Sequence, residues 1–503
     1  VGYGVQKKSD VTGAMARVTS KVIEDRPVQN ALQAMQGRVT GVDITSNNRP
    51  GELGDIRIRG NRSLTADNNP LYVIDGIPMS AGSIADVNPS DIESMEILKD
   101  ASATAIYGSR GANGVILVTT KKGKTGRTTI NYDGSFSFGF LDSTTDYMNS
   151  GQLLDYNRQS AITGGTYNGR YGDNPDPERD KALWLNPNNM SYMDKRLEKV
   201  YQQNADGTYS YDPSQLETTD WGELVTRTAF THNHQISLSA GTETSKLYVS
   251  LGYLDQKVPM KDQDFKRYTA NINGEIIPTK WLKVGMGLNA THSIKNYGIV
   301  SNTSNTGAKD SYGLAMDMMP WVPAYNEDGS LYLHPYISGG KVYYVKNPII
   351  EMTENTTTYS QDNFRLTGNL EFQILPELKL LTQYTYQRRK GEESSYASSN
   401  TQEGSGYWGD QKGVGRWAYS AGQTMEFEGR LTYNKTFNEK HSLHALGAIV
   451  YNKDRQNNTY FKLRDFPDDE VQNGIWQGSD LVDYGGKGGS AVGSVMFSYI
   501  ARA

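Results

Sequence analysis

The sequence predicts a membrane β-barrel preceded by a smaller mixed α/β domain, and three observations lead to this fold class. After residue 126, ten segments alternate apolar and polar residues with the period of two that is typical of half-buried strands. The connections between these segments alternate between short and long. Aromatic residues make up 10% of the chain, and the 33 tyrosines among them suit a surface that is partly apolar and partly wet.

Composition limits the other classes of protein. The 51 basic and 56 acidic residues leave a net charge of −5, which gives no electrostatic reason to expect a nucleic-acid partner. Cysteine is absent, so disulfides, thiolate metal sites and cysteine nucleophiles are excluded. Mean hydropathy is −0.62 and no apolar run reaches the ~18 residues of a membrane helix, but alternating barrel strands are compatible with such low hydropathy.

The chain divides into three parts, namely 1–10, 11–125 and 126–503. In the second part, helical spacing predicts a helix over 28–37, and a further helix is predicted over 101–107. Asp91 is a candidate N-cap for another short helical segment. Short strands are predicted over 42–45, 55–59, 71–74 and 115–120. The second part is therefore predicted to be a small mixed α/β domain.

The third part contains the ten predicted strands. They span 127–140, 229–240, 245–256, 265–276, 281–292, 362–375, 378–390, 420–437, 441–453 and 490–503. Their lengths suit a bilayer, because a spanning strand needs about 9–11 tilted residues.

The connections between these strands indicate which kind of sheet they form. Every even-numbered connection has four residues or fewer, whereas every odd-numbered connection is longer and 141–228 and 293–361 are much longer. An antiparallel sheet with this pattern has tight turns at one end and all insertions at the other. Outer-membrane barrels have this asymmetry. A soluble β-sandwich or other meander is the alternative.

Both ends of the sequence suggest a fragment, or a chain that is continued elsewhere. The N-terminus has no basic stretch followed by an apolar core, so no signal peptide is recognised. At the C-terminus, 494–503 stops within a strand-like run.

Three stretches of the N-terminal domain resemble a known family. They are 72–78 (YVIDGIP), 92–100 (IESMEILKD) and 101–123 (ASATAIYGSRGANGVILVTTKKG). This long match is similar to the plug domain of SusC/RagA-type TonB-linked outer-membrane transporters. The IRIRG sequence at 56–60 resembles a plug strand found across TonB-dependent transporters, and 1–8 resembles the end of the family's TonB box and the stretch after it.

The resemblance implies a barrel of 22 antiparallel strands with the plug domain inside its lumen. The sequence departs from this pattern because it supplies about ten strands. Eight-stranded barrels are filled by their own side chains, and a plugged lumen requires about 22 strands. The expected content is therefore the plug and the N-terminal half of the barrel, without the family's regulatory-like extension and signal peptide.

The resemblance also implies a function, which is TonB-dependent import of an oligomeric nutrient across the outer membrane of a Gram-negative bacterium. Oligosaccharide is the commoner substrate class in the family, and oligopeptide is the alternative. The implied partners are TonB, outer-membrane lipid and a SusD-like surface lipoprotein that closes the barrel as a lid. Residues of the TonB-coupling segment present here are Val1, Gly2, Tyr3 and Gly4. A siderophore or cobalamin receptor and a surface adhesin that transports nothing are the alternatives.

By resemblance, the plug loops 60–69 and 79–85 face outward and can touch substrate. Candidate substrate-binding residues are Asn61, Arg62, Asp67, Asn68 and Asn69, and ordinary solvated turns are the more common role of such residues. Charged residues in a domain enclosed by a barrel must be paired, so plug–barrel ion pairs are expected. The residues expected to form them are Arg57, Arg59, Glu93, Glu96 and Arg110.

Other signals are weaker. His232 and His234 share one side of a strand, where a polar lumen face is a more common role than metal binding. The acidic run 468–470 reads as a solvated loop rather than a Ca²⁺ site. Trp321 and Trp417 fall in long loops, where they stack on sugars or pack loops together. Because no nucleophile–base set or carboxylate pair stands out, we expect no catalysis, no cofactor and no metal.

Overall fold

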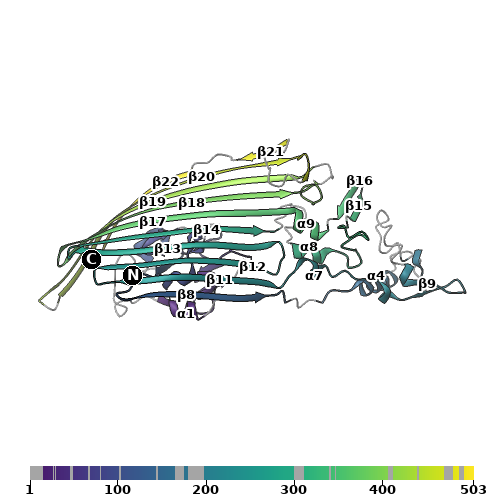
Figure 1. Ribbon diagram of the computed structural model, residues 1–503, viewed down its shortest axis with the longest axis horizontal. Coiled ribbons are helices and arrows are strands. Elements are labelled where there is room, and N and C mark those ends of the chain that lie inside the picture. Colours follow the sequence, from purple (N-terminus) through teal and green to yellow (C-terminus); the bar gives the residue numbers. More distant parts are fainter. Residues whose placement is uncertain are drawn as a thin grey trace.

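The computed structural model describes two parts, a plug domain and a large antiparallel sheet that lies against it (Figure 1). The described residues are 15–298 and 311–502, except 26–27, 29, 46–48, 66–67, 80, 101–103, 143–145, 165–174, 179, 181–197, 333, 339–340, 346, 406–411, 439–440, 470–479 and 486–491.

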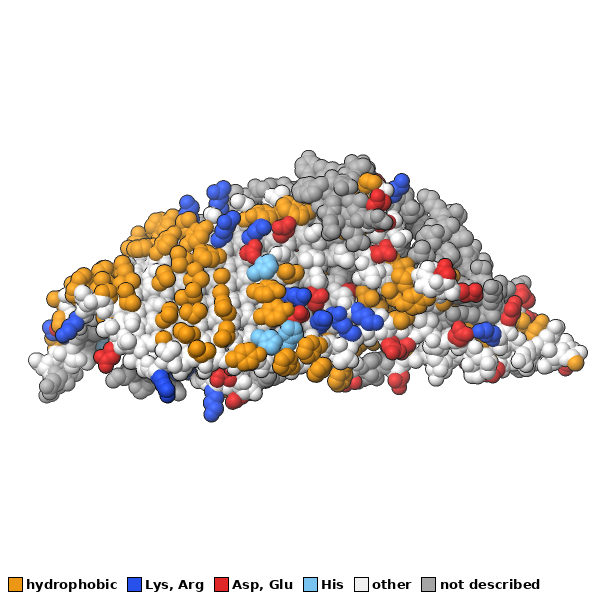
Figure 2. All heavy atoms as spheres, in the orientation of Figure 1, with side chains coloured by type: hydrophobic (Ala, Val, Ile, Leu, Met, Phe, Trp, Pro, Cys, Tyr) orange, Lys and Arg blue, Asp and Glu red, His pale blue; other side chains and the backbone are white. Residues whose placement is uncertain are grey.

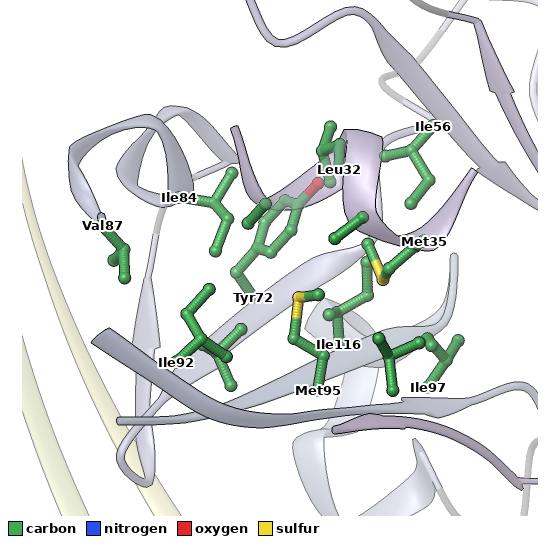
Figure 3. Packing of buried hydrophobic residues seen from close by; sticks show 14 of the residues in the cluster. Leu32, Met35, Ile56, Tyr72, Ile84, Val87, Ile92, Met95, Ile97 and Ile116 are labelled. Atoms are coloured by element: carbon green, nitrogen blue, oxygen red, sulfur yellow. The ribbon is translucent and has the colours of Figure 1, made fainter. Parts of the chain in front are cut away.

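The plug is built on a five-stranded sheet whose strands lie in the order β1-β6-β7-β4-β5. The bounds of these strands are β1 (Met15–Thr19), β6 (Ile92–Leu98), β7 (Val115–Thr120), β4 (Leu71–Ile74) and β5 (Ile77–Met79). Only β4 and β7 pair in parallel. A separate hairpin joins β2 (Val42–Thr45) to β3 (Asp55–Ile58). Apolar side chains from the sheet and its helices form one core, in which Tyr72, Met95 and Ile116 are buried (Figure 3).

The plug helices are short. They are α1 (Ser20–Glu24), α2 (Ala31–Met35) and the 3₁₀ segments η2 (Ala81–Asp86), η3 (Pro89–Asp91) and η4 (Ala105–Gly111). The Asn30 side chain caps α2 by accepting from the Gln33 N–H at 3.0 Å. In η4 the helical path breaks at Gly108, which adopts φ 57°.

One plug prediction is wrong, because no helix follows Asp91. The next residues form β6, which pairs with β1 on one side and β7 on the other. Asp91 instead ends a 3₁₀ turn that Asn88 caps by accepting from the Ser90 N–H. The apolar residues of 92–98 are buried on both faces of the sheet, which hides the period expected of a half-buried strand.

The large sheet contains eleven strands among the described residues, and all neighbours are antiparallel. They are β8 (Gly126–Gly139), β11 (Ala229–Gly241), β12 (Ser245–Lys257), β13 (Gln263–Thr279), β14 (Leu282–Tyr297), β17 (Asn355–Leu375), β18 (Leu378–Ala397), β19 (Val414–Phe437), β20 (His441–Arg464), β21 (Asp480–Gly485) and β22 (Val492–Arg502). The observed strands overlap all ten predicted segments, and several of them extend further at the long-loop end.

The sheet has an apolar outer face and a polar face toward the plug, which we call the lumen face. On β13, Arg267, Thr269 and Asn271 are buried against the plug, whereas Tyr268 and Ala270 point outward. Figure 2 shows the outer face, where apolar side chains form slanted rows over the strands and charged side chains gather toward the long-loop end. This is the alternation of a membrane barrel wall.

This division predicts opposite tolerances at adjacent positions of β17. Leu370 is on the outer face, whereas Asn369 lines a cavity on the lumen face. We expect Leu370→Arg to destabilise the barrel by about 2–4 kcal/mol, because it places a charge near mid-bilayer, and Asn369→Arg to cost much less. Urea unfolding of the full-length protein in lipid vesicles measures both. Equal losses would contradict the assigned faces.

The long loops fold into a cap at one end of the strands (Figure 1). The cap contains α4 (Ser150–Gly164), α7 (Trp221–Val225), α8 (Ser311–Asp317), α9 (Pro348–Glu354), η5 (Pro213–Gln215) and two hairpins, β9 (Tyr201–Gln203) with β10 (Tyr209–Tyr211) and β15 (His334–Ser338) with β16 (Lys341–Val345). Its own apolar core includes Trp221 and Trp321. Across the described ranges, no helix is long and apolar enough to cross a bilayer.

Candidate functional site

The plug touches the lumen face through residues 85–91, which we call the docking segment. Asp86 is buried there and accepts hydrogen bonds from side chains of three wall strands. Its carboxylate accepts from Asn363 at 3.0 Å and Gln361 at 3.1 Å, and it pairs with the Arg389 guanidinium at 3.1 Å. Its backbone carbonyl accepts from the Thr291 hydroxyl at 2.9 Å. Asp86 therefore links the plug to β17 and β18 through its carboxylate and to β14 through its backbone carbonyl.

Asp91 ends the docking segment and is 2% exposed. Its carboxylate oxygen Oδ1 accepts from the Ser250 hydroxyl at 2.6 Å, Gln235 at 2.7 Å and the Tyr248 hydroxyl at 3.0 Å. These three donors belong to β11 and β12, so the two aspartates hold the plug to different strands. None of the three donors carries a formal charge, which distinguishes this contact from the one at Asp86.

Main-chain and amide groups complete the docking segment. The Arg267 guanidinium donates to the Ala85 carbonyl at 3.1 Å, and the Asn88 amide donates to the Thr269 hydroxyl at 3.4 Å. Both wall residues are on β13, between the strands that hold the two aspartates. The docking segment therefore spans consecutive strands with polar contacts rather than with apolar packing.

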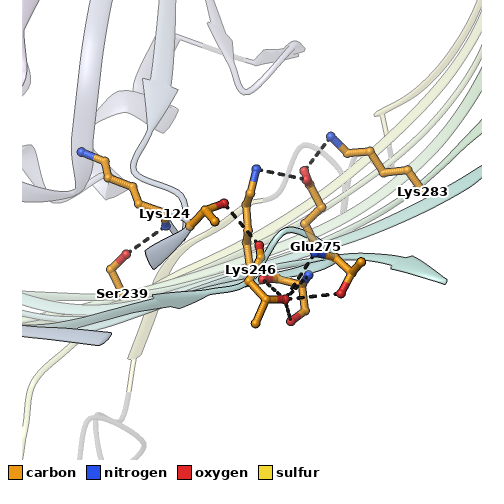
Figure 4. A network of polar contacts seen from close by, with 9 residues as sticks. Lys124, Ser239, Lys246, Glu275 and Lys283 are labelled. Atoms are coloured by element: carbon orange, nitrogen blue, oxygen red, sulfur yellow. Dashed lines mark hydrogen bonds and ion pairs between the residues drawn. The ribbon is translucent and has the colours of Figure 1, made fainter. Parts of the chain in front are cut away.

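Further contacts hold the plug above and below the docking segment. Toward the long loops, Lys295 of the wall pairs with Glu52 of the plug at 2.9 Å. Toward the short turns, the Asn273 amide donates to the Lys121 carbonyl at 3.1 Å, and the Lys124 N–H donates to the Ser239 hydroxyl at 3.1 Å (Figure 4). The plug is thus held along the whole height of the wall.

A polar cavity of about 320 Å³ separates plug and wall near the short turns. Asp75 and Lys122 line it from the plug, and Arg365 lines it from the wall. Glu275 also lines it, where it pairs with Lys283 at 2.8 Å and lies 3.9 Å from Lys246, as Figure 4 shows. This part of the plug is therefore next to a cavity lined by charges instead of being packed against the wall.

Burial raises the pKa of both docking carboxyls. For Asp86, the positive charges of Arg389, Arg365 and Arg267 oppose the increase. For Asp91, the hydrogen bonds from its three wall donors oppose it, as does the charge of Lys121. A carboxyl whose pKa is higher in the docked state binds protons more strongly there than in water.

The docked plug should therefore be more stable at mildly acidic pH. The raised pKa of Asp91, whose three wall donors are uncharged, means that stability falls as pH rises from the ordinary aspartate value of 3.8 through the raised value. We expect more hydrogen-exchange protection of the docking segment at about pH 5 than at about pH 7.5, after correction for intrinsic rates. Asp91→Asn should reduce this difference. Greater protection at the higher pH would contradict the sign.

Three of the charged plug residues find partners inside the plug rather than on the wall. Arg59 pairs with Asp100, and Glu96 lies 3.4 Å from Arg17 on the neighbouring strand β1. Arg57 donates to the Asn61 and Asn69 side chains, both at 3.0 Å. Arg57 is on β3, Arg59 is in the turn that follows β3, and Glu96 is on β6, so their nearest partners belong to the plug.

The remaining two charged residues differ from each other. Within the described residues Glu93 has no ion-pair or hydrogen-bond partner. The charge of Arg110 acts on Glu426 of β19, so this residue lies toward the wall.

The predicted substrate-binding residues belong to one exposed turn. The side-chain oxygen Oδ1 of Asn68 accepts from the Arg62 and Ser63 backbone N–H groups, and its side-chain amide Nδ2 donates to the Ser63 backbone carbonyl. The side chains of Asn61 and Asn69 both accept hydrogen bonds from the Arg57 guanidinium. Three of the four described candidates therefore hold the conformation of the loop. Arg62 is exposed beside the fully exposed Leu64.

Other predicted site residues lie outside the described part of the chain. These are Asp67 and the TonB-coupling residues Val1, Gly2, Tyr3 and Gly4.

The expectation that His232 and His234 face the lumen is wrong. Both are on the outer face, where His232 packs against Tyr253 and His234 contacts the hydroxyl of Tyr132. The lumen face was expected because histidine is polar, but aromatic rings of intermediate polarity also suit the boundary between lipid and water. The register with β8 and β12 fixes which face they occupy.

The two tryptophans have packing roles. Trp321 is buried in the cap core, and Trp417 is in β19 rather than in a loop, where it stacks on Tyr419 and Phe461. In the described residues, no group of three or more His, Asp or Glu side chains is placed to hold a metal ion. Asp469 of the acidic run binds Tyr396 and Ser399 instead.

Sequence reasoning missed Asp86 and the wall residues that receive it. The available signal was the placement of arginines at lumen-face positions of predicted strands, such as Arg267 and Arg365, in otherwise alternating patterns. A buried cation in such a wall requires an acidic partner from another element. The identity of this acidic partner depends on how the plug is positioned against the wall.

Comparisons with known proteins agree with this architecture. Residues 7–115 match the family model of the TonB-dependent Receptor Plug Domain. TonB-dependent receptor P3 of Formosa agariphila is 30% identical over 474 residues, which cover 94% of this chain and 41% of that protein. TonB-dependent receptor SusC of Bacteroides thetaiotaomicron is 33% identical over 385 residues, which cover 73% and 31%. The chain therefore spans less than half the length of these relatives.

Solved structures give the same result. The RagAB peptide importer in its open-open state aligns with a TM-score of 0.76 and 25% identity over 99% of this chain and 53% of that chain. The ferric citrate transporter FecA aligns with a TM-score of 0.51 and 9% identity over 98% and 52%, which shows a shared fold.

The plug and the strands against it define the chain as part of a plugged β-barrel of the Gram-negative outer membrane. It belongs to the SusC/RagA type of TonB-dependent transporters. The predicted fold class and family are confirmed, and the wall present here is a partial barrel.

Proposed function

We propose that the protein containing this chain imports an oligomeric nutrient across the outer membrane with energy supplied through TonB. The observation that carries the proposal is the polar attachment of the docking segment to strands β11 to β18. Hydrogen bonds and ion pairs can be exchanged for bonds to water, so this side of the plug can shift without exposing a large apolar surface. The apolar plug–wall contact is at β20, where Leu71, Val73 and Leu98 pack with Val450. The polar cavity lined by Asp75 and Arg365 is large enough to hold water at this interface.

Oligosaccharide is the first substrate candidate, because it is the substrate class expected from the family resemblance. Oligopeptide is the second, and the structural likeness to the RagAB peptide importer favours it. Residues that would contact either substrate include Arg62, whose side chain is exposed on the plug turn.

A surface lipoprotein of the SusD type is the proposed partner at the cap. The cap is a folded platform with its own core, and Tyr147, Met148, Met319 and Tyr325 are exposed on it. Large apolar side chains that remain exposed on a folded surface are typical of interaction sites.

Uptake by cells tests the proposal. Cells that make the full-length protein are given labelled oligosaccharides or oligopeptides, with and without residues 1–4. We expect that deletion of residues 1–4 abolishes energy-dependent accumulation while surface binding persists, because the segment grips TonB by strand pairing. Unchanged accumulation would refute the TonB role. Binding without accumulation by the intact protein would indicate an adhesin, and an iron- or cobalamin-linked growth defect would indicate a receptor of that class.

A further inference from the structure

The outer face of the wall carries a groove that neither the plug nor the cap occupies. Its volume is about 670 Å³, and its floor includes Ala270 of β13 and Ala290 of β14. These two small residues are register partners, and Tyr268, His292 and Phe364 rise around them. A groove of this kind on a membrane-facing wall accommodates a hydrocarbon chain.

One end of the groove is cationic. Arg388 and Lys390 of β18 line it there, and both point outward because Arg389 between them reaches Asp86 of the plug. Among the described residues Arg388 has no hydrogen-bond or ion-pair partner. Lys390 lies 3.4 Å from Glu392, and both of these side chains are substantially exposed. Arg388 is therefore a free, exposed cation at the end of an apolar groove.

The next strands add to this charge. Arg388 is in register with Gln423 of β19, which is in register with Arg455 of β20, and Lys453 precedes it on the same face. Arg455 and Lys453 are exposed. Toward the long-loop end of β17 to β20, the outer face carries four cations and two carboxylates. The cations are Arg388, Lys390, Lys453 and Arg455, and the carboxylates are Asp362 and Glu392. Asp362 is held by the His292 ring at 2.7 Å.

The height of these cations on the wall is set by the strands. β18 begins at Leu378 directly after a short turn, and Arg388 is ten residues further along. The outer-face side chains between these two residues are mostly apolar or aromatic. On β20, which begins at His441, Lys453 follows after twelve residues. About 9–11 residues span a bilayer, so both cations reach the headgroup level at the long-loop end. In Figure 2, blue side chains border the apolar rows on this side.

We propose that this groove binds lipid A, the phosphorylated and acylated glycolipid of the outer leaflet. An acyl chain would lie over Ala270 and Ala290, and a phosphate would bind Arg388 and Lys390. Arginine suits this role because its planar guanidinium binds two phosphate oxygens at once. Lipid A combines a phosphate with chains that lie along a barrel wall, and it matches both ends of the groove. This inference concerns the wall and is independent of the transported substrate.

Native mass spectrometry of the full-length protein in detergent tests the proposal with three probes: lipid A, dephosphorylated lipid A and inorganic phosphate. We expect retention of lipid A, and at least about tenfold weaker binding in the R388Q/K390Q double variant because two charge-assisted contacts are lost. Ala290→Trp should weaken binding by filling the groove. Lys266→Gln removes an outward charge that does not line the groove and should leave binding unchanged.

Several outcomes would overturn the proposal. These are equal binding of dephosphorylated lipid A, unchanged binding in both groove variants, loss of binding in Lys266→Gln alone, and displacement of lipid A by equimolar inorganic phosphate. Resistance of the folded barrel to sodium dodecyl sulfate at room temperature confirms that each variant is folded. Because binding is measured without uptake, failure of the transport proposal leaves this test interpretable.

Discussion

Asp86→Ala should detach the docking segment from the wall and make the barrel leak. The substitution removes the carboxylate that faces Arg389, Arg365 and Arg267, and it leaves these cations in a buried interface without that counter-charge. Removing one partner of a buried ion pair costs about 3–5 kcal/mol, which is a large fraction of the stability of a domain. The loss falls on the plug–wall contact, because no strand pairing of the wall involves this residue.

Two measurements check this result. Hydrogen exchange of the docking segment should accelerate, and cells should become sensitive to large antibiotics that an intact plug excludes. Asp86→Asn keeps a hydrogen-bonding side chain and should have a smaller effect. Glu96→Gln is the matched control, because its ion pair with Arg17 is partly exposed and should contribute only about 0–1 kcal/mol. If Asp86→Ala and Glu96→Gln behave alike, the docking segment does not hold the plug.

Trp321→Ala should unfold the cap and leave the wall and plug intact. Trp321 is 2% exposed in the cap core, beside Trp221 and Val225. Replacing a buried tryptophan by alanine costs about 3–5 kcal/mol, because it removes apolar contacts and leaves a cavity. A small helical cap has little other core to compensate for this loss.

Limited proteolysis measures this effect. We expect faster cleavage within α7 and α8, while resistance of the barrel to sodium dodecyl sulfate at room temperature is retained. Co-purification of a surface lipoprotein, if the cap binds one, should also decrease. Tyr325→Ala changes an exposed cap residue and should leave the proteolysis rate unchanged. Equal cleavage of the two variants would show that the cap does not depend on its core.

The outer face of the wall was predictable because lipid favours apolar side chains on one face of each strand and the lumen favours polar side chains on the other. The alternation of Tyr268, Ala270 and Ile272 with polar neighbours on β13 is visible in the sequence, and the structure places all three outward. The extensions of β17 to β20 toward the cap were not predicted. Their outer residues, such as Ser360 and Glu392, are polar like their lumen neighbours, so the period of two disappears there.

The candidate site was predictable only in part. Five charged plug residues were expected to form ion pairs with the wall, but Arg59 and Glu96 take partners within the plug, and Glu93 has none among the described residues. Asp86 and Asp91 were not expected to bind the wall, because their partners come from strands about 140 to 300 residues away in the chain. No local pattern records a contact of that separation.

By itself, the sequence determined the fold class, the family and the polarity of each strand, because periodicity and motifs are local properties of the chain. Only the tertiary structure decided where the plug sits on the wall and which carboxylates hold it. It also decided that β6 is a strand and that His232 and His234 face outward. These features depend on strand register and on the seating of one domain against another, and burial energy fixes both only when the whole sheet is assembled.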